Sequence, residues 1–293
     1  MQVINGGVSG NLIQKGIYAT IAYAFIMSLT ALGAKIVQQQ IPVVTLVFWQ
    51  SLFCVLLLLP QQRGRWCRRP AKVWWVHFLR SVGGFTGFMF YYLALNHIPL
   101  VEASLLRACA PLCVPLVVLL MHRLHLPWHR WLPLGVGFIG VLFIIQPTPT
   151  GLNPWHLVGF LSAVGLAFSM VTTRMLSKSV HSQETMTVYF LVSCGLSLIL
   201  VCLQGESLWL PISLWGWVLL VASTLYVGMF LYTKAYTYAP ASLVSPVSYI
   251  GVVFSGVWGW LLWGHVPNEL ALLGGLAIFI SILLSARLSR SKS

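Results

Sequence analysis

Acidic residues are nearly missing from this sequence. Its 293 residues contain no aspartate and only four glutamates, against 17 lysines and arginines, so the formal net charge is +13. Charged residues of either sign make up 7% of the chain, whereas about a quarter of the residues of a soluble globular domain are charged. The shortage of charge therefore excludes a soluble domain of this length.

Long apolar segments fill most of the sequence instead. Apolar residues account for 58% of the chain, and the mean hydropathy is +0.87. A helix needs about 20 apolar residues to cross a hydrocarbon core of about 30 Å. The sequence therefore predicts an all-α membrane protein with ten transmembrane helices. The predicted spans are residues 14–38, 42–60, 73–95, 101–121, 129–146, 155–174, 184–203, 213–236, 241–263 and 269–287.

The basic residues divide the predicted loops into two classes. Three of them, Lys35, Arg80 and Arg107, lie three or more residues inside predicted spans, and the odd-numbered loops contain none. Cytoplasmic loops retain Lys and Arg, so we expect both termini in the cytoplasm, and one span more or fewer would destroy the pattern. The even-numbered loops, their flanks and the tails hold the rest: Lys15, Arg63, Arg65, Arg68, Arg69, Lys72, Arg123, Arg130, Arg174, Lys178, Lys234, Arg287, Arg290 and Lys292.

Several other classes of protein are disfavoured. The basic residues are scattered over short loops, so we expect them to set topology and meet anionic lipid, with no nucleic acid as partner. Residues 1–13 lack a basic segment, and the first apolar stretch is too long for a cleavable signal peptide. The six cysteines lie in spans or in a cytoplasmic loop, where no disulfide is expected. No metal or other cofactor is predicted.

A weak internal repeat relates the two halves at an offset of about 140 residues. Residues 92–99 resemble residues 232–240, and His125-Leu-Pro127 resembles His265-Val-Pro267. Each half then has five spans, and an odd number inverts the second half in the membrane, as in many secondary transporters. We expect a cytoplasmic tail at 1–13, repeats of five helices at 14–146 and 155–288, an external linker at 147–154 and a second tail at 289–293.

The pattern resembles the EamA-type branch of the drug/metabolite transporter superfamily over about residues 15–288. The family commonly has Glu where His125 and His265 stand, and often Arg in place of Gln50. The resemblance implies a bacterial inner-membrane carrier with a central cavity, for substrates ranging from amino acids, nucleotide-linked and riboflavin-like compounds to amphiphilic drugs. The phrases that carry it are Arg80-Ser-Val-Gly-Gly, Tyr92-Leu-Ala-Leu-Asn-His-Ile-Pro-Leu-Val-Glu-Ala103, Ala110-Pro111 and Gly135-Val-Gly-Phe-Ile-Gly-Val141.

Prolines mark a candidate binding site. Predicted spans 4 and 9 correspond in the two halves, and they contain Pro111 and Pro115 in one and Pro246 in the other. A proline frees a helix carbonyl that lipid cannot satisfy but a polar cavity can. A simple kink is the alternative. Interruptions at corresponding positions favour the cavity.

Arg107 is the first candidate contact for a substrate. It lies inside predicted span 4, four residues before Pro111. An intramembrane arginine usually faces protein or water, and its planar fork suits a carboxylate or phosphate. The alternatives are snorkelling and pairing with Glu102, although residues five apart do not face each other on a helix. Glu102 is expected either to complement the helix dipole or to carry a proton.

The remaining candidates surround the same region. Lys35 and Arg80 either line the permeation path or snorkel. Buried tyrosine hydroxyls need partners and can orient a ligand. Tyr91 and Tyr226 also lie in spans that the resemblance places around the cavity, and packing is the alternative role for each tyrosine. The predicted substrate-binding residues are Arg107, Tyr92, Tyr232, Tyr249, Arg80, Lys35, Gln50 and Glu102, with Pro111, Pro115 and Pro246 as kinks.

Two further motifs do not support a function. The glycines at 135, 137 and 140 match a dinucleotide-binding fingerprint, but no strand precedes them, and small residues in a span favour close helix packing. The cytoplasmic histidines 122, 125 and 129 are interrupted by Pro127 and lack a carboxylate or cysteine. Glycines in spans 5 and 10 would also permit a homodimer contact.

The sequence thus predicts a transporter, not an enzyme. We expect secondary active or facilitative transport of a small organic metabolite with an anionic or zwitterionic group, amino acid or nucleotide-like, by rocking of the two halves about Arg107. The lack of deep carboxylates favours facilitated diffusion or substrate exchange over proton exchange. The alternatives are an exporter of amphiphilic or cationic drugs, a membrane-embedded enzyme that uses the histidine cluster, and a non-transporting sensor.

Overall fold

The computed structural model describes residues 10–62, 69–122, 131–145, 153–177, 179–239 and 241–290. Within these ranges the chain is all-helical and contains no β-strand, which confirms the predicted class. Short 3-10 turns flank two helices, at Leu59–Gln62 and Ile212–Leu214. The α-helices are α1 (Gly10–Val37), α2 (Val43–Leu58), α3 (Ala71–His97), α4 (Leu100–Ala108), α5 (Ala110–His122), α6 (Trp131–Ile145), α7 (Pro154–Leu176), α8 (Ser182–Gln204), α9 (Trp215–Tyr238), α10 (Ala241–Ser248), α11 (Ile250–Trp263) and α12 (Glu269–Arg290).

Seven helical segments of the described chain are long and apolar enough to cross a membrane, by length and composition. Two of them combine consecutive short helices: Leu100–Met121 covers α4 and α5, and Pro246–Trp263 covers the end of α10 and all of α11. Shorter apolar helices occur at Gly135–Ile145 and Glu269–Leu284. The structure is therefore that of a protein that crosses the membrane several times.

The predicted spans 4 and 9 are each interrupted. α4 ends at Ala108 and α5 begins at Ala110, and α10 ends at Ser248 while α11 begins at Ile250. Pro111 explains the first interruption, because its missing N–H leaves the carbonyl four residues earlier, that of Arg107, without its helical donor. Pro246 lies three residues before the second interruption, whereas α5 continues through Pro115.

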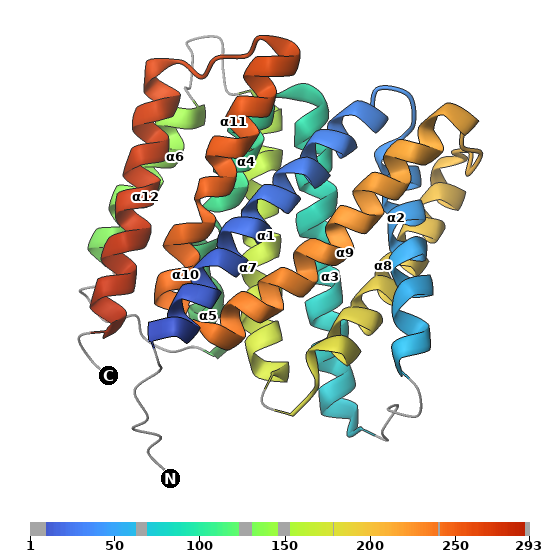
Figure 1. The fold of residues 1–293 in the computed structure, drawn as a ribbon, viewed down its shortest axis with the longest axis horizontal. Helices are drawn as coiled ribbons and strands as arrows, with labels where there is room; N and C mark the ends of the chain where they lie inside the picture. Colours follow the sequence, from blue (N-terminus) through green and yellow to red (C-terminus); the bar gives the residue numbers. More distant parts are fainter. Residues whose placement is uncertain are drawn as a thin grey trace.

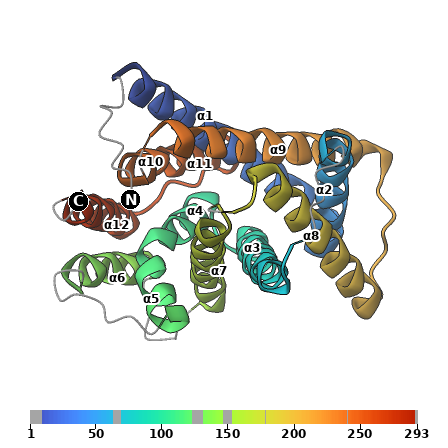
Figure 2. The same cartoon turned by 90° about the horizontal axis from the view of Figure 1, so that it is seen from below.

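The helices pair across the two halves of the sequence. α3 packs along α7 and α1 along α9, while α2 contacts α8, and α6 contacts α12. When each of the first five predicted spans is exchanged with its counterpart among the last five, the α3–α7 pair becomes the α9–α1 pair. The α2–α8 and α6–α12 pairs are each converted into themselves. Figure 2 shows α6 and α12 at one end of the molecule, and α2 and α8 at the other. In Figure 1, the start of α1 and the end of α12 both lie at the lower left, on the same side of the bundle.

Glycines bring the paired backbones into contact. A Cβ atom at Gly165 of α7 would lie 2.7 Å from the backbone nitrogen of Gly87 on α3, so neither position has room for a side chain. Between α6 and α12, a Cβ atom at Gly274 would lie 2.5 Å from the carbonyl oxygen of Gly140. The glycines of predicted spans 5 and 10 are therefore used within one chain, while Gly135 has open space around it.

The ends of α3 and α9 have the same geometry. α3 is followed by Ile98 with φ −124° and ψ 161°, and α9 by Ala239 with φ −134° and ψ 148°. Each of these extended residues precedes a proline in the sequence, and proline disfavours the helical conformation for the residue before it. The sequence repeat thus corresponds to a repeated way of ending a helix.

Candidate functional site

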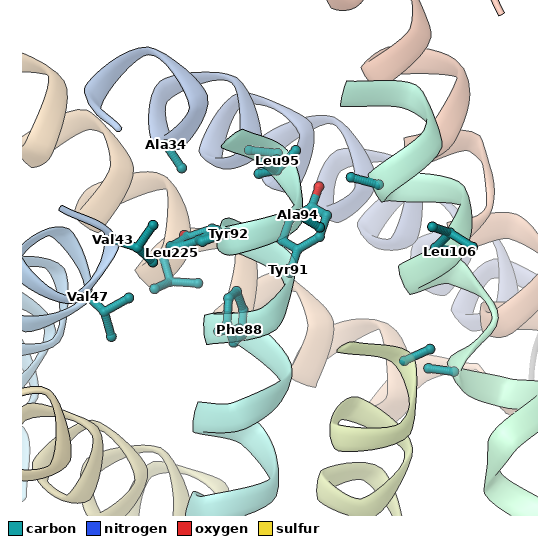
Figure 3. Packing of buried hydrophobic residues seen from close by; sticks show 14 of the residues in the cluster. Ala34, Val43, Val47, Phe88, Tyr91, Tyr92, Ala94, Leu95, Leu106 and Leu225 are labelled. Carbon is teal, nitrogen blue, oxygen red and sulfur yellow. The ribbon is translucent and has the colours of Figure 1, made fainter. Parts of the chain in front are cut away.

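Arg107 lies in the last turn of α4, beside the interruption, and its side chain reaches α3. Its Nη1 donates a hydrogen bond of 2.9 Å to the carbonyl of Gly87. Its Cζ lies 4.3 Å from the ring centroid of Phe88 and 4.8 Å from that of Tyr91. Figure 3 shows Phe88 and Tyr91 projecting from successive turns of α3. The half-buried guanidinium therefore rests on two aromatic rings with several donors left over.

The carboxylates of the chain lie elsewhere. All four glutamates fall within the described ranges, and the sequence has no aspartate. Glu102 contacts His156, Glu184 contacts Arg69, and the side chains of Glu206 and Glu269 are exposed. Arg107 consequently forms no ion pair with a described residue, and the chain has no spare buried carboxylate to give it one.

Glu102 finds a partner that the sequence did not indicate. Its Oε2 lies 2.9 Å from Nε2 of His156, in the first turn of α7. Pairing with Arg107, an alternative drawn from the sequence, does not occur. Nothing in the sequence links positions 102 and 156, because the contact depends on how α4 and α7 pack.

Tyr92 is fully buried and donates a hydrogen bond of 3.0 Å to Oε1 of Gln50 on α2. The neighbouring Tyr91 hydroxyl lies 3.0 Å from Oγ of Ser104, which donates at 3.0 Å to Ser255 of α11. This second chain of hydrogen bonds joins α3, α4 and α11. The two hydroxyls are thus satisfied within the protein, as buried polar groups require.

Arg80 lies on α3 seven residues before Gly87, and its side chain is 7% exposed. Its Nε donates a hydrogen bond of 3.3 Å to Thr173 of α7, and its Cζ lies 4.2 Å from the ring centroid of Tyr189 on α8. Buried Nη1 has no hydrogen-bond partner among the described residues. Arg80 is therefore a second buried cation without a carboxylate.

The aromatic contact of Arg80 does not by itself offset the free-energy cost of burying its guanidinium group. An arginine at the centre of a membrane costs about 2.5–3.5 kcal/mol on insertion scales, and a cation–π contact returns about 0.5–2 kcal/mol. The hydrogen bond to Thr173 adds a partner for one of five N–H groups. The remaining donors favour an anion.

Lys35 takes part in the structure of the bundle. Its Nζ donates hydrogen bonds of 2.9 Å to the carbonyl of Leu95 and 2.8 Å to that of Ile98. In a continuous helix the carbonyl of Leu95 would accept a hydrogen bond from the N–H of residue 99. Pro99 has no N–H, so the ammonium of Lys35 takes the place of that donor. Lys35 also lies 5.5 Å from the ring centroid of Trp263. It holds α1 against the end of α3.

The other predicted tyrosines lie farther apart. Tyr249 stands at the interruption between α10 and α11 and donates a hydrogen bond of 2.8 Å to Gly275 of α12. The ring centroid of Tyr232 lies 5.2 Å from that of Tyr23 on α1.

Of the predicted residues, Arg80 and Tyr92 thus lie on α3 itself, and Arg107 and Gln50 contact that helix at Gly87 and Tyr92. Lys35 and Glu102 lie near the end of that helix, and Tyr249 lies against α12. Sequence reasoning missed the aromatic side chains Phe88 and Tyr189, which cover the two guanidinium groups. An aromatic residue in an apolar span carries no signal that separates this role from ordinary packing.

Two other features do not add to the site. No group of three potential metal ligands occurs among the described residues, and His125 and His129 of the cytoplasmic cluster lie outside them. A groove of about 360 Å³ between α3 and α7 is lined by apolar side chains such as Phe78, Leu161 and Val164. These three are exposed, so the groove faces outward, toward lipid.

The described part of the chain is an apolar helical bundle that contains two arginines without a carboxylate partner. These features define a multi-pass membrane protein with an internal polar site. Comparison with known families agrees with this class. The chain belongs to the EamA-like transporter family, whose profile matches it twice, over residues 14–146 and 153–287. This membership confirms the resemblance read from the sequence and assigns the chain to transporters of small metabolites.

The relatives are transporters with different substrates in their names. The chain is 30% identical over 287 residues to the pseudopaline exporter CntI of Pseudomonas aeruginosa, covering 96% of this chain and 98% of that one. It is 23% identical over 240 residues to an S-adenosylmethionine uptake transporter of Rickettsia bellii, covering 80% and 81%. A riboflavin transporter of Brucella anthropi is 28% identical over 154 residues, covering 52% and 54%.

A solved structure shares the fold. A protein crystal structure superposes with a TM-score of 0.60 at 22% identity, covering 94% of this chain and 99% of that one. The likeness therefore extends over the whole bundle.

Proposed function

We propose that this protein carries a small metabolite with an anionic or zwitterionic group across the bacterial inner membrane by alternating access. The observation that carries the proposal is the guanidinium of Arg107, which lies at a helix interruption, stacks on Phe88 and Tyr91, and has no carboxylate partner. The planar fork of an arginine binds a carboxylate or phosphate through two parallel hydrogen bonds.

The proposed topology has ten transmembrane helices in two inverted repeats, with both termini in the cytoplasm. Seven long apolar segments, the shorter apolar parts of α6 and α12, and the more polar α3 would make up the ten spans. The pairing of α3 with α7 and of α1 with α9 supports a two-fold relation between the halves. The absence of Lys and Arg from alternate predicted loops supports the orientation.

The names of the relatives support a small organic substrate. Pseudopaline, S-adenosylmethionine and riboflavin are different molecules, and the relatives include both an exporter and uptake transporters. The choice of an acidic group rests on the charges of this chain. Lys35, Arg80 and Arg107 are all at least partly buried, whereas the nearby Glu102 contacts His156.

The test is transport by purified protein in liposomes, with a panel of radiolabelled amino acids, nucleotides and organic acids. Arg107→Gln should reduce transport of the preferred anion at least tenfold, because a charge-assisted hydrogen bond is worth about 1.5–3 kcal/mol. Arg174→Gln is a matched control, since this arginine is exposed and its side chain forms no hydrogen bond with a described residue. Normal transport by correctly folded Arg107→Gln would overturn the proposal.

Competition separates this proposal from export of cationic or amphiphilic drugs. If the arginines line the path, anions should compete with the substrate, and hydrophobic cations should be repelled. Inhibition by hydrophobic cations alone, unchanged in Arg107→Gln, would favour the drug exporter, with the aromatic side chains as its binding surface.

A further inference from the structure

We infer that the substrate carries two acidic groups, one bound by Arg107 and the other by Arg80. This inference rests on the proposed function and narrows its substrate class to diacids and polyacids. It depends on three observations: the two arginines lie along one face of α3, a buried tyrosine ring covers Arg80 and the next turn of that helix, and neither arginine can be neutralised by the protein itself.

The first observation is the spacing. Arg107 is anchored on α3 at Gly87, seven residues after Arg80. Seven residues make about two turns, so both positions share one face of the helix, about 10 Å apart along its axis at 1.5 Å per residue. A single small ion cannot contact two groups at that separation, whereas one extended molecule with acidic ends can.

The second observation is the surface between the two arginines. Gly84 occupies the turn between Arg80 and Gly87, and a Cβ atom there would lie 2.8 Å from Cε2 of Tyr189. The ring of Tyr189 therefore lies directly against the backbone of α3. The same ring stacks on Arg80, whose Cζ lies 4.2 Å from the ring centroid. Its buried ring makes the surroundings of Arg80 apolar on the α8 side, which strengthens the attraction of this guanidinium for an acidic group.

The third observation is charge balance. Nη1 of Arg80 is buried and has no hydrogen-bond partner in the described part of the chain. Glu184, the buried carboxylate on α8, is engaged by Arg69 at 3.1 Å, and Glu102 is engaged by His156 at 2.9 Å. A ligand with one acidic group would leave one of the two guanidinium groups uncompensated, and a ligand with two would satisfy both.

The test measures how tightly the purified full-length protein binds propionate, glutarate, pimelate and sebacate. Calorimetry or thermal stabilisation gives each affinity. The carboxylates of the three diacids lie progressively farther apart. Affinity in the wild type should rise at least tenfold from propionate to a diacid long enough to reach both arginines. Equal affinity for propionate and for every diacid would overturn the proposal without any variant.

Arg80→Gln then identifies the second contact. It should abolish the advantage of the long diacid while leaving propionate binding within about threefold of the wild type. Arg174→Gln removes the same charge from an exposed position and should leave both affinities unchanged. If Arg80→Gln fails to fold, Arg80→Lys should still lower diacid affinity, because an ammonium lacks the bidentate fork.

The outcomes separate the two proposals. If Arg107→Gln binds propionate as the wild type does, the proposed function itself fails. If Arg107→Gln loses propionate while Arg80→Gln weakens propionate and diacids equally or not at all, the proposed function stands and the two-acid substrate is refuted.

Discussion

Replacing Lys35 with methionine tests whether this buried ammonium belongs to the fold or to the substrate site. Methionine keeps the length and apolar volume of the side chain but leaves the carbonyls of Leu95 and Ile98 without their donor. A buried acceptor left unsatisfied costs about 1–3 kcal/mol. Two carbonyls lose their donor, and the favourable removal of a desolvated ammonium offsets part of that cost. We therefore expect the free energy of unfolding to fall by about 2–4 kcal/mol.

The measurement is the free energy of unfolding in mixed micelles of increasing denaturing detergent. Lys234→Met is the matched control, because the Lys234 ammonium faces the rings of Phe230 and Tyr238, at 5.5 and 5.9 Å. Losing those contacts should cost less than about 1 kcal/mol. If Lys35→Met were as stable as Lys234→Met but lost substrate affinity, Lys35 would be a substrate ligand, as first expected from the sequence.

Two further changes probe the packing around the site. Gly165→Val should prevent folding or cost several kcal/mol, because its side chain would meet the backbone of Gly87, whereas Gly135→Ala, at an open position, should change the yield of folded protein little. Tyr92→Phe should destabilise the protein by about 1 kcal/mol through the lost bond to Gln50. An unchanged unfolding free energy in Tyr92→Phe would contradict that bond.

The class of fold could be predicted because its signals are distributed over many residues. The one-sided placement of Lys and Arg and the repeat at about 140 residues depend on no single position. Pro111 and Pro246 drew attention to the two segments that the structure interrupts, because a missing backbone donor acts locally. Pro115 shows the limit of that signal, since α5 continues through it.

The partners of the charged residues could not be predicted. Whether Glu102 faces Arg107 or His156 depends on the packing of α4 against α7, and no sequence spacing encodes it. Lys35 was placed among the predicted substrate-binding residues, with snorkelling as its alternative, although Pro99 already implied a carbonyl in need of a donor near the end of α3. That inference requires knowing that α1 passes this helix end, which only the three-dimensional arrangement provides.

The close glycine contacts between α3 and α7 bear on which parts can move as rigid bodies. These helices belong to different sequence repeats, and so do α1 and α9; a Cβ atom at Gly16 of α1 would lie 2.5 Å from that of Ala239, the residue that follows α9. Backbones in such contact cannot separate without exposing the groove between them to lipid. In the proposed transport cycle, a rocking motion would therefore preserve the pairs and divide each repeat. The boundary between the moving bodies would then not follow the boundary between the duplicated sequences.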